Sequence, residues 1–455
     1  MLKRHCVIAV SLLALVSASA GAETKWTVKP EWVAAHEAFL ASDALRGRGS
    51  ATPDEATAAA YVAAQFQAYG LRTAPGMDSY EQTATVVKPV LSGHASLMIG
   101  SAKADEGQGL TLIYSSGKPI TGTLAVATSD DPKAIPAGDI LLVANPGKTP
   151  LTQFSRAAMA HGAKMIIFQD SDGARALYAR FGNTTGTSTT LEGGVSGMGG
   201  ARPDYVMLSP EVFDKVAAQT GATVAFDTGG TTLDRSFTTN AIGYLPGSDP
   251  KAGTILITAH LDHLGVRKGV IYHGANDDAS GTTAVMEVAH ALAAGGQPRR
   301  SILFVAYGSE EIGGLGSTYF GEHPPVPLSD IVANLEFEMI GAQDPKMAPG
   351  ELMMTGFERS NLGEALKAKG ARVTTDPYPD QHFFERSDNY SLALKGIVAH
   401  TISGWAVTPT YHDPSDDLAH LNLPFMTAAI QSLIIPVEYL ANSDFKPEWK
   451  AGGKP

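Results

Sequence analysis

Residues 254–294 have the sequence TILITAHLDHLGVRKGVIYHGANDDASGTTAVMEVAHALAA. The stretch begins with a strand, 254–259, that is apolar on both faces, and it ends with a helix, Ser280–Ala294, with an apolar stripe. A strand without a polar face has to be covered on both sides, which is typical of the largely parallel sheets of α/β proteins. The stretch therefore predicts an α/β fold.

Later segments repeat this pattern of buried strands alternating with helices. Further strands are expected at 301–307, 333–340 and 396–403. Together they predict a three-layer α/β/α sandwich around a mixed, mostly parallel sheet. Ligand sites in such sheets lie at the carboxyl ends of the strands, so polar residues at these ends are the candidates for function.

The N-terminal half of the chain has a different character. Thr52-Pro53-Asp54-Glu55 predicts a capping box that opens a helix. From about Pro89 to Arg235 the chain is rich in short strands and turns, with a strand-helix-strand unit at 139–168. We therefore expect catalytic-domain segments at 23–90 and 236–455, separated by a β-rich insert at 91–235. Thr184–Gly200 is rich in Gly, Ser and Thr and predicts a plain linker or a mobile loop.

The first 22 residues predict a signal peptide. Lys3 and Arg4 precede an apolar centre, and small residues around Ala20 offer a cleavage site. The only cysteine, Cys6, lies inside this segment, so the mature chain would have no disulfide and no thiolate ligand. An exported chain without disulfides suits a bacterial periplasm or the medium, with no membrane contact after cleavage.

Composition and charge exclude some classes of partner. The chain of 455 residues is 44% hydrophobic and 18% charged, which is ordinary for a globular protein with a large core. Its formal net charge is -12, and Lys and Arg form no cluster. Nucleic acids and anionic membranes attract clustered cations, so neither is expected as a partner.

A histidine ends the strand 254–259. His260 is followed at the second position by Asp262, and metal-bound imidazoles usually donate their other N–H to such a carboxylate. This favours His260 as a metal ligand over a structural histidine. His263 and His273 lack such support and are expected to be loop residues or neighbours of ligands.

Acidic residues follow at two more junctions. In Gly274–Gly281, Asp278 or Ser280 is expected to cap the helix, which leaves Asp277 free to bridge two cations. Glu310 and Glu311 follow a buried strand; one of them can bind metal while the other takes a proton from water.

The remaining candidates lie further along the chain. Glu336 and Glu338 alternate on one face of an apolar strand, where a carboxylate is costly unless it is paired or metal-bound, so either is a candidate ligand. His412 is a loop histidine beside Tyr411, whose phenol can stabilise an oxyanion. Phe383, Phe384 and Trp405 are explained equally well by a substrate pocket and by core packing, and Arg386 is a candidate partner for a substrate carboxylate.

These segments, in this order, resemble the two-zinc exopeptidase family that contains bacterial leucyl-type aminopeptidases, glutamate carboxypeptidase and glutaminyl cyclases. The resemblance covers roughly 32–85 and 237–441, including Thr239–Gly243, and the insert, by its strand-helix-strand unit, resembles a protease-associated domain. The resemblance implies two Zn²⁺ per chain, with ligands His260, Asp277 (bridging), Glu311, Glu338 and His412. It also implies Glu310 as general base, Asp262 orienting His260 and Tyr411 polarising the scissile carbonyl.

The chain departs from the family pattern at one ligand. An aspartate normally precedes Met-Ile-Gly, whereas this chain has Glu338, and Glu336 remains the fallback. The resemblance further implies a non-proline cis peptide bond at Asp277-Asp278. Ser387-Asp388-Asn389 resembles a loop that lines the substrate pocket, and a helix cap explains it equally well.

The expected function is an exported zinc aminopeptidase that acts on peptides with a free N-terminus. The alternatives are a glutaminyl-peptide cyclotransferase that uses one zinc on the same scaffold, and a non-catalytic binding module. Carboxylates near the metals favour recognition of an N-terminal ammonium over a C-terminal carboxylate.

Overall fold

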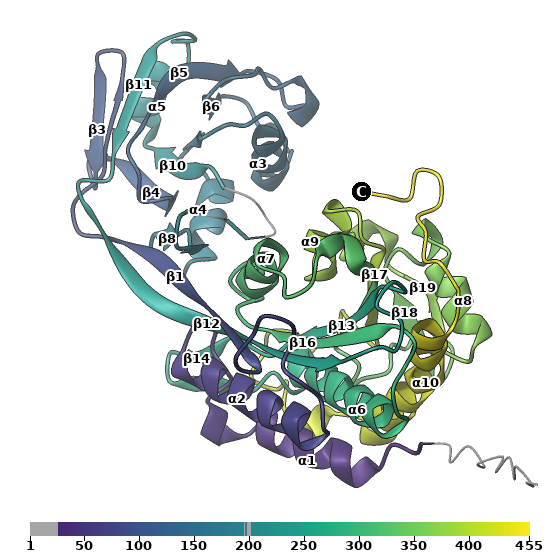
Figure 1. Ribbon diagram of the computed structural model, residues 1–455. Coiled ribbons are helices and arrows are strands. Elements are labelled where there is room, and N and C mark those ends of the chain that lie inside the picture. Colours follow the sequence, from purple (N-terminus) through teal and green to yellow (C-terminus); the bar gives the residue numbers. More distant parts are fainter. Residues whose placement is uncertain (1–25, 195, 198–201) are drawn as a thin grey trace, which may run out of the picture.

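A computed structural model describes residues 26–194, 196–197 and 202–455. The chain forms two nine-stranded sheets, each with its own helices, and a small two-stranded hairpin (Figure 1). The predicted signal peptide, Met1–Ala22, lies outside the described residues. The predicted α/β class is confirmed.

The first sheet carries the strands that were predicted from residue 254 onward. Its order is β19-β18-β20-β17-β13-β16-β12-β1-β9. Their bounds are β1 Glu81–Leu91, β9 Thr190–Leu191, β12 Thr231–Leu245, β13 Thr254–His260, β16 Ser301–Tyr307, β17 Ile331–Glu338, β18 Leu352–Met354, β19 Val373–Thr375 and β20 Ala399–Ser403.

The direction of the strands differs from the prediction at the flanks of this sheet. The four central strands, β20, β17, β13 and β16, run parallel to one another. On either side, β18 is antiparallel to β20, and β12, β1 and β9 add antiparallel pairings. The sheet is therefore mixed, as predicted. It is parallel mainly at its centre, so the expectation that most of the sheet is parallel is wrong.

The central strands are buried on both faces, as their sequences predict. In β13, Ile255 and Ile257 pack into one core while Leu256 packs into the core on the other side. β16 divides in the same way, with Phe304 on one side and Val305 on the other. Because successive side chains of a strand point to opposite faces, an uninterrupted apolar run needs two covering layers.

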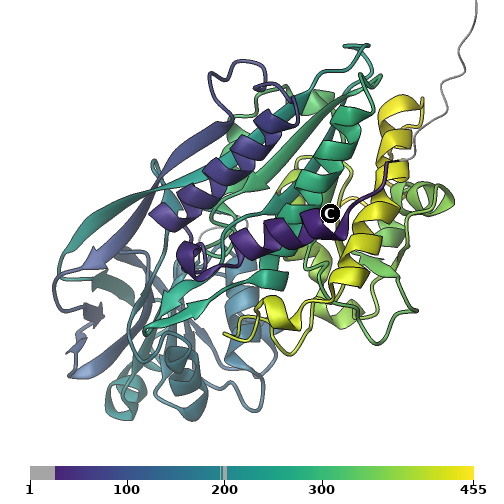
Figure 2. The ribbon, with the colours of Figure 1, turned by 90° about the horizontal axis from the view of Figure 1, so that it is seen from below.

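Helices supply both layers. One face packs against five helices: α1 Pro30–Leu40, α2 Pro53–Ala68, α6 Ser280–Ala294, α8 Leu362–Ala368 and α10 Leu423–Asn442. Figure 2 shows α1, α2, α6 and α10 lying over this face of the sheet. The other face is covered by α7 Leu315–Glu322 and α9 Asn389–Leu394.

Helix α10 is the one described helix that is long and apolar enough to cross a membrane. The mean hydropathy of its apolar window is 1.4, and half of that window is buried. Its buried side chains, such as Leu433 and Val437, belong to the core that it shares with α6 and α1. We therefore interpret α10 as a core helix.

The second sheet is built from the segment that was predicted as an insert. Its strands, in spatial order, are β10 Asp204–Leu208, β7 Met165–Gln169, β6 Ile140–Val143, β5 Ile120–Ala127, β11 Thr223–Asp227, β2 Ser96–Ile99, β3 Ala102–Glu106, β4 Gly109–Ser115 and β8 Gly186–Thr187. An additional pairing of β10 with β4 closes the sheet into a ring. Closure removes exposed strand edges, which are prone to aggregation. Its helices are α3 Leu151–Ala160, α4 Asp172–Ala179 and α5 Pro210–Val216.

Two long strands connect the two sheets (Figure 1). β1 and β12 are antiparallel over their whole shared length, from Glu81 opposite Ala241 to Leu91 opposite Thr231. The first half of β12 is mostly exposed and leads to the second sheet, whereas its last half is buried beside β16.

The segment Thr184–Gly200, predicted as a linker or mobile loop, contains two short strands among its described residues. β8 pairs with β4 of the second sheet, and β9 pairs with β1 of the first. The described part of this segment is thus attached to both sheets and is more ordered than a plain linker.

A buried histidine near the start of β20 predicts how stability depends on pH. His400 in β20 donates from Nδ1 to the Thr355 carbonyl (2.8 Å) and accepts at Nε2 from the Ser360 hydroxyl (2.7 Å). Burial lowers the pKa of His400 to about 4. The unfolded chain, with an imidazole pKa of about 6.5, binds more protons between these values, so stability is lost as the pH falls through 6.5 towards 4.

We therefore expect the free energy of unfolding to fall by about 2 kcal/mol between pH 7 and pH 5 through His400 alone. In His400→Gln this part of the pH dependence should disappear, although the variant is less stable at pH 7. Denaturant unfolding at the two pH values measures the difference, and the exposed His161→Gln is the matched control. An unchanged pH dependence in His400→Gln would contradict the prediction.

Candidate metal centre and active site

The polar residues singled out in the sequence meet at one edge of the first sheet. This edge is formed by the carboxyl ends of the parallel strands, where α/β proteins bind ligands. His260 and Glu338 are the last residues of β13 and β17, and Glu310 and Glu311 directly follow β16. Asp277 lies in the turn Ala275–Ala279 before α6, and His412 lies in the loop after β20.

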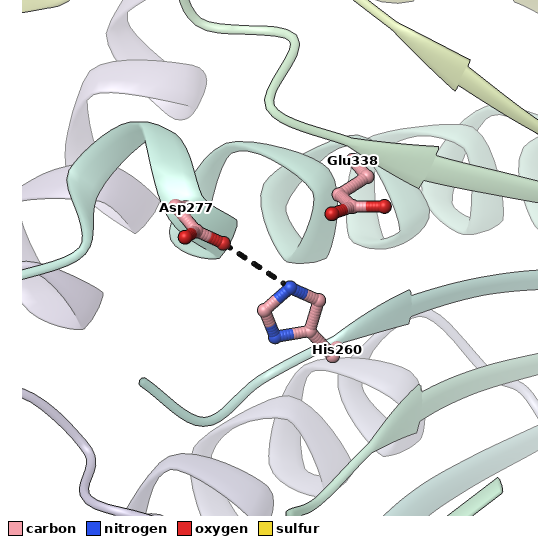
Figure 3. Close-up of side chains that lie close together, drawn as sticks. All are labelled: His260, Asp277 and Glu338. Carbon is pink, nitrogen blue, oxygen red and sulfur yellow. Dashed lines mark ion pairs between the residues drawn. The ribbon is translucent and has the colours of Figure 1, made fainter. Parts of the chain in front are cut away.

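A first cluster consists of His260, Asp277 and Glu338 (Figure 3). One oxygen or nitrogen atom of each residue lies within 4.8 Å of the others. His260 Nε2 is 3.3 Å from Asp277 Oδ1. Although burial acts in the opposite direction, the neighbouring Asp262 and Asp277 raise the pKa of His260 well above its usual value.

A second cluster shares Asp277 with the first. His412 Nε2 lies 3.2 Å from Asp277 Oδ2 and 3.1 Å from Glu311 Oε2. On the other side, His263 Nδ1 lies 2.8 Å from Glu311 Oε1 and 3.8 Å from Asp277 Oδ2. The two carboxylates are therefore flanked by two imidazoles, and Asp277 faces both clusters.

His263 has a more direct place in this cluster than the sequence suggested. It was expected to be a loop residue or a neighbour of ligands, yet it is fully buried and brings a ring nitrogen to Glu311. His273, given the same interpretation, lies at the surface and pairs with Asp43 at 2.7 Å. The sequence signal that could have identified His263 as a member of the cluster is its spacing, because it lies three residues after His260, which ends a strand.

Glu336 and Glu338, the two candidate ligands on β17, have different surroundings. Glu338 faces His260 and Asp277. Glu336 is fully buried and instead accepts the backbone N–H of Asn389 at 2.5 Å. Glu336 thus ties α9 to β17, and the geometry favours Glu338 as the ligand.

Asp262 does more than was predicted. Its carboxylate is 3.7 Å from His260 Nδ1, and its backbone carbonyl is closer, at 3.2 Å. The carboxylate also accepts the backbone N–H groups of Glu310 (2.9 Å) and Glu311 (3.3 Å). Asp262 therefore fixes the position of the Glu310-Glu311 pair as well as contacting His260.

Glu55 stabilises the turn that leads into the Glu310-Glu311 pair, a role that the sequence did not suggest. Predicted as part of a capping box, it accepts instead from Thr239 N–H (2.9 Å) and from the N–H and hydroxyl of Ser309 (3.0 and 2.9 Å). A Cβ atom on Gly308 would lie 2.6 Å from Glu55 Oε1, so this turn requires glycine. Thr52 does cap α2, accepting from Asp54 N–H at 3.3 Å.

The turn that carries Asp277 is fixed by two other carboxylates. Asp278 Oδ1 accepts the Gly281 N–H in the first turn of α6, as predicted, whereas Ser280 donates to the Asn276 carbonyl. Asp416 accepts the N–H groups of Asn276 (2.9 Å) and Asp277 (3.0 Å). The expected cis peptide bond at Asp277-Asp278 is confirmed.

Several buried nitrogen and oxygen atoms in the clusters make no hydrogen bond among the described residues, although some of them lie at ion-pair distance from one another. They are His260 Nε2, both ring nitrogens of His263, Asp277 Oδ2 and Glu311 Oε1. Leaving a buried polar atom unpaired costs about 1–3 kcal/mol. Imidazole nitrogens and carboxylate oxygens converging without thiolates are typical ligands of divalent cations, zinc among them. The residues therefore fit one divalent cation at each cluster.

Comparison with known families identifies part of the chain. Residues 240–435 match the model described as Peptidase family M28, and both clusters lie within this segment. Residues 240–435 are therefore a segment of the peptidase family M28 type.

Two curated relatives extend the comparison beyond this segment. A probable lipoprotein aminopeptidase of Mycobacterium tuberculosis is 26% identical over 358 residues, which are 68% of this chain and 66% of that protein. Leupeptin-inactivating enzyme 1 of Streptomyces exfoliatus is 38% identical over 220 residues, 42% of this chain and 47% of that protein. The matches thus span only about half to two thirds of these two relatives.

A solved structure shows the same fold. A zinc aminopeptidase from Bacillus subtilis superposes with a TM-score of 0.53 at 20% identity, covering 94% of this chain and 97% of that one. At this identity the likeness concerns the fold of the chain and not its substrate.

A small cavity of about 30 Å³ adjoins the first cluster of this M28 domain. Glu338, Tyr411, Phe383, Arg386 and Ser387 line it, among others. Phe384 and Trp405 are not among its lining residues, and Phe384 packs into the core. Of the three aromatic residues considered for a pocket, only Phe383 lines this cavity; Tyr411, considered for oxyanion stabilisation, lines it as well. Of the 387–389 segment, Ser387 lines the cavity, while Asp388 accepts from Ser317 and provides no side-chain cap to α9.

The position of His263 leads to a test that does not depend on activity. We expect His263→Ala to weaken zinc binding at one of two sites by about 10- to 100-fold, the usual effect of removing a group that directly supports a metal ligand. Zinc titration of chelator-treated protein by calorimetry measures this effect. His273→Ala, at the surface, should bind zinc like the wild type; equal zinc binding by both variants would show that His263 is only a packing residue.

Proposed function

We propose that this chain is an exported aminopeptidase that uses two zinc ions to release the N-terminal residue of peptides. The match of residues 240–435 to peptidase family M28 and the name of the mycobacterial relative support an aminopeptidase. The observation that carries the proposal is the position of Asp277, which faces both clusters while Glu310 follows the adjacent strand β16.

The two clusters suit the two ions. His260, Asp277 and Glu338 would hold the first ion, and Asp277, Glu311 and His412, with His263, would hold the second. When bound, zinc supplies Lewis acidity that lowers the pKa of water and polarises a carbonyl group. The carboxylates of the two clusters and of Glu310 form an anionic site that attracts the ammonium group of a free N-terminus.

Glu310 is the general base in this proposal. Burial raises the pKa of Glu310 well above its usual value, and Asp388, Glu311 and Glu338 add to the effect. Cations bound beside Glu310 would act in the opposite direction and keep it ionised. The ionised Glu310 then takes the proton from the attacking water and passes this proton to the leaving amine. One water is therefore consumed for each peptide bond broken.

Tyr411 stabilises the developing oxyanion in this proposal. Its ring stacks on His412, with centroids 3.9 Å apart, and it lines the small cavity beside Glu338. Burial raises the pKa of Tyr411 far above its usual value, so the phenol remains a hydrogen-bond donor at neutral pH. Donors directed at a developing oxyanion are a major source of catalysis in acyl transfer.

Two further parts of the proposal concern location and the insert. Residues 1–22 have the pattern of an export signal, and one relative is named as a lipoprotein, which supports a periplasmic or secreted enzyme. We assign the second sheet to a protease-associated-like insert, because its parallel β6-α3-β7 unit follows the predicted pattern.

The experiment compares unblocked with N-acetylated aminoacyl anilides in the presence of zinc. An aminopeptidase should turn over the unblocked substrates and leave the acetylated ones intact. Equal rates on the two substrates would reject the proposed function. Release of ammonia from glutaminyl peptides in a parallel assay would indicate a cyclase instead.

A further inference from the structure

A second, larger cavity lies between the two sheets. It has a volume of about 560 Å³, within the range of small-molecule and peptide sites. Its walls come from both parts of the chain. Lys88 of β1 and Arg267 of the hairpin strand β14 (Gly265–Arg267) lie on one side, and Tyr114 of β4 and Arg202, which precedes β10, lie on the other.

The charge of this cavity is opposite to that of the chain. The chain has a net charge of -12, yet Lys88, Arg202 and Arg267 are three of the four charged residues that line the cavity. Other exposed arginines of the insert region, such as Arg175 and Arg235, form ion pairs with carboxylates. Lys88, Arg202 and Arg267 form no ion pair within the described part of the chain. Cations concentrated in a concave site raise the local concentration of anionic ligands.

The fourth charged residue connects this cavity to the metal centre. Glu311 belongs to the second cluster and also lines the large cavity. Glu338 belongs to the first cluster and lines the small cavity. The two cavities therefore adjoin different ends of the metal centre, so a peptide that reacts there can extend from one into the other.

The sizes and charges of the cavities set the direction of the peptide. The small cavity, lined by Phe383 and Met353 among others, has a volume of only about 30 Å³ and suits a small first side chain, beside the carboxylates that attract the N-terminal ammonium. The rest of the peptide then enters the large cavity, and an extended chain advances about 3.3 Å per residue. Within a few residues its free carboxylate would reach cations, and guanidinium groups bind carboxylates in a bidentate manner.

We propose that the large cavity binds the C-terminal carboxylate of short peptides and so makes di- to tetrapeptides the preferred substrates. This inference rests on the proposed aminopeptidase function. It assigns the insert a role in selecting substrate length, since Arg202 and Tyr114 belong to it while Lys88 and Arg267 do not.

The experiment uses the full-length, zinc-loaded protein and three substrates: an aminoacyl anilide, the corresponding aminoacyl-Gly-Gly acid, and its C-terminal amide. We expect the wild type to have a KM about fivefold lower for the acid than for the amide, as for one exposed ion pair, with similar kcat. The preference should decrease at high salt.

The double variant Lys88→Gln/Arg267→Gln should lose this preference and still hydrolyse the anilide at the wild-type rate. Lys251→Gln, an exposed cation on the turn between β12 and β13, should keep the preference. The inference would be overturned if the wild type hydrolysed the anilide but had equal KM values for the acid and the amide. It would also be overturned if the double variant kept the preference for the acid. Either result would leave the proposed aminopeptidase function standing. Failure to hydrolyse the anilide would remove the proposed function itself.

Discussion

Replacing Glu310 by Gln is expected to lower kcat by about a thousandfold, within the range that a positioned general base contributes. Gln has nearly the same shape and keeps the backbone N–H that bonds to Asp262 (2.9 Å), so the turn after β16 should stay in place. The variant lacks only the basic oxygen. KM and zinc content should therefore stay close to those of the wild type, measured by steady-state kinetics and metal analysis.

Glu322→Gln is the matched control, because this exposed glutamate ends α7 far along the same connection. It should retain full activity. If Glu310→Gln also loses zinc, then Glu310 is a ligand and not the base. If its kcat is unchanged, the base lies elsewhere and the assignment of the Glu310-Glu311 pair is wrong.

The elements of the first sheet follow directly from the sequence because their signals are local. The strand predicted at 254–259 is β13, Thr254–His260, and the helix predicted at Ser280–Ala294 has these bounds in the structure. Strand direction is not a local property. The antiparallel flanks depend on where the chain returns from the insert, and hydrophobic periodicity contains no such information.

The structure brings the predicted ligands together because they lie at one edge of the first sheet: His260 and Glu338 end strands, and the others lie in adjoining turns and loops. Glu55 and Asp416 were missed because they act on backbone groups that only the fold brings near. Glu55 lies in α2 and reaches Ser309, and Asp416 reaches the backbone of Asp277 across 139 positions of the chain. A carboxylate that holds a distant loop has no sequence pattern of its own, so such supporting residues emerge only from the packed structure.

Glu338 lies in the first cluster although it departs from the family pattern. Glu338 is the last residue of β17, and its carboxylate lies within 4.8 Å of the ligand atoms of His260 and Asp277. The extra methylene group relative to aspartate thus extends the side chain to the cluster from the strand end. The position of Glu338 therefore supports the prediction that it is the ligand. Glu336 instead accepts a hydrogen bond from the backbone N–H of Asn389.

Asp277→Asn is expected to abolish activity and to release both zinc ions, because this side chain contacts both clusters. The substitution keeps the size of the side chain but removes its negative charge. Removing a residue that merely supports a ligand weakens metal binding by about 10- to 100-fold, and loss of the shared carboxylate should exceed that at each site. Zinc content by mass spectrometry after gel filtration would fall from two ions per chain towards none.

Variants that change only one of the two clusters are the controls for this prediction. Glu338→Gln affects only the first cluster and Glu311→Gln only the second, so each should lose about one ion and retain the other. A ligand that binds only the folded state stabilises it, so the stabilisation by added zinc should disappear in Asp277→Asn and be partial in the other two variants. If Asp277→Asn keeps one ion, the two clusters are independent. Asp277 would then be an ordinary ligand of one site, and a shared carboxylate would no longer be the basis of the proposed chemistry.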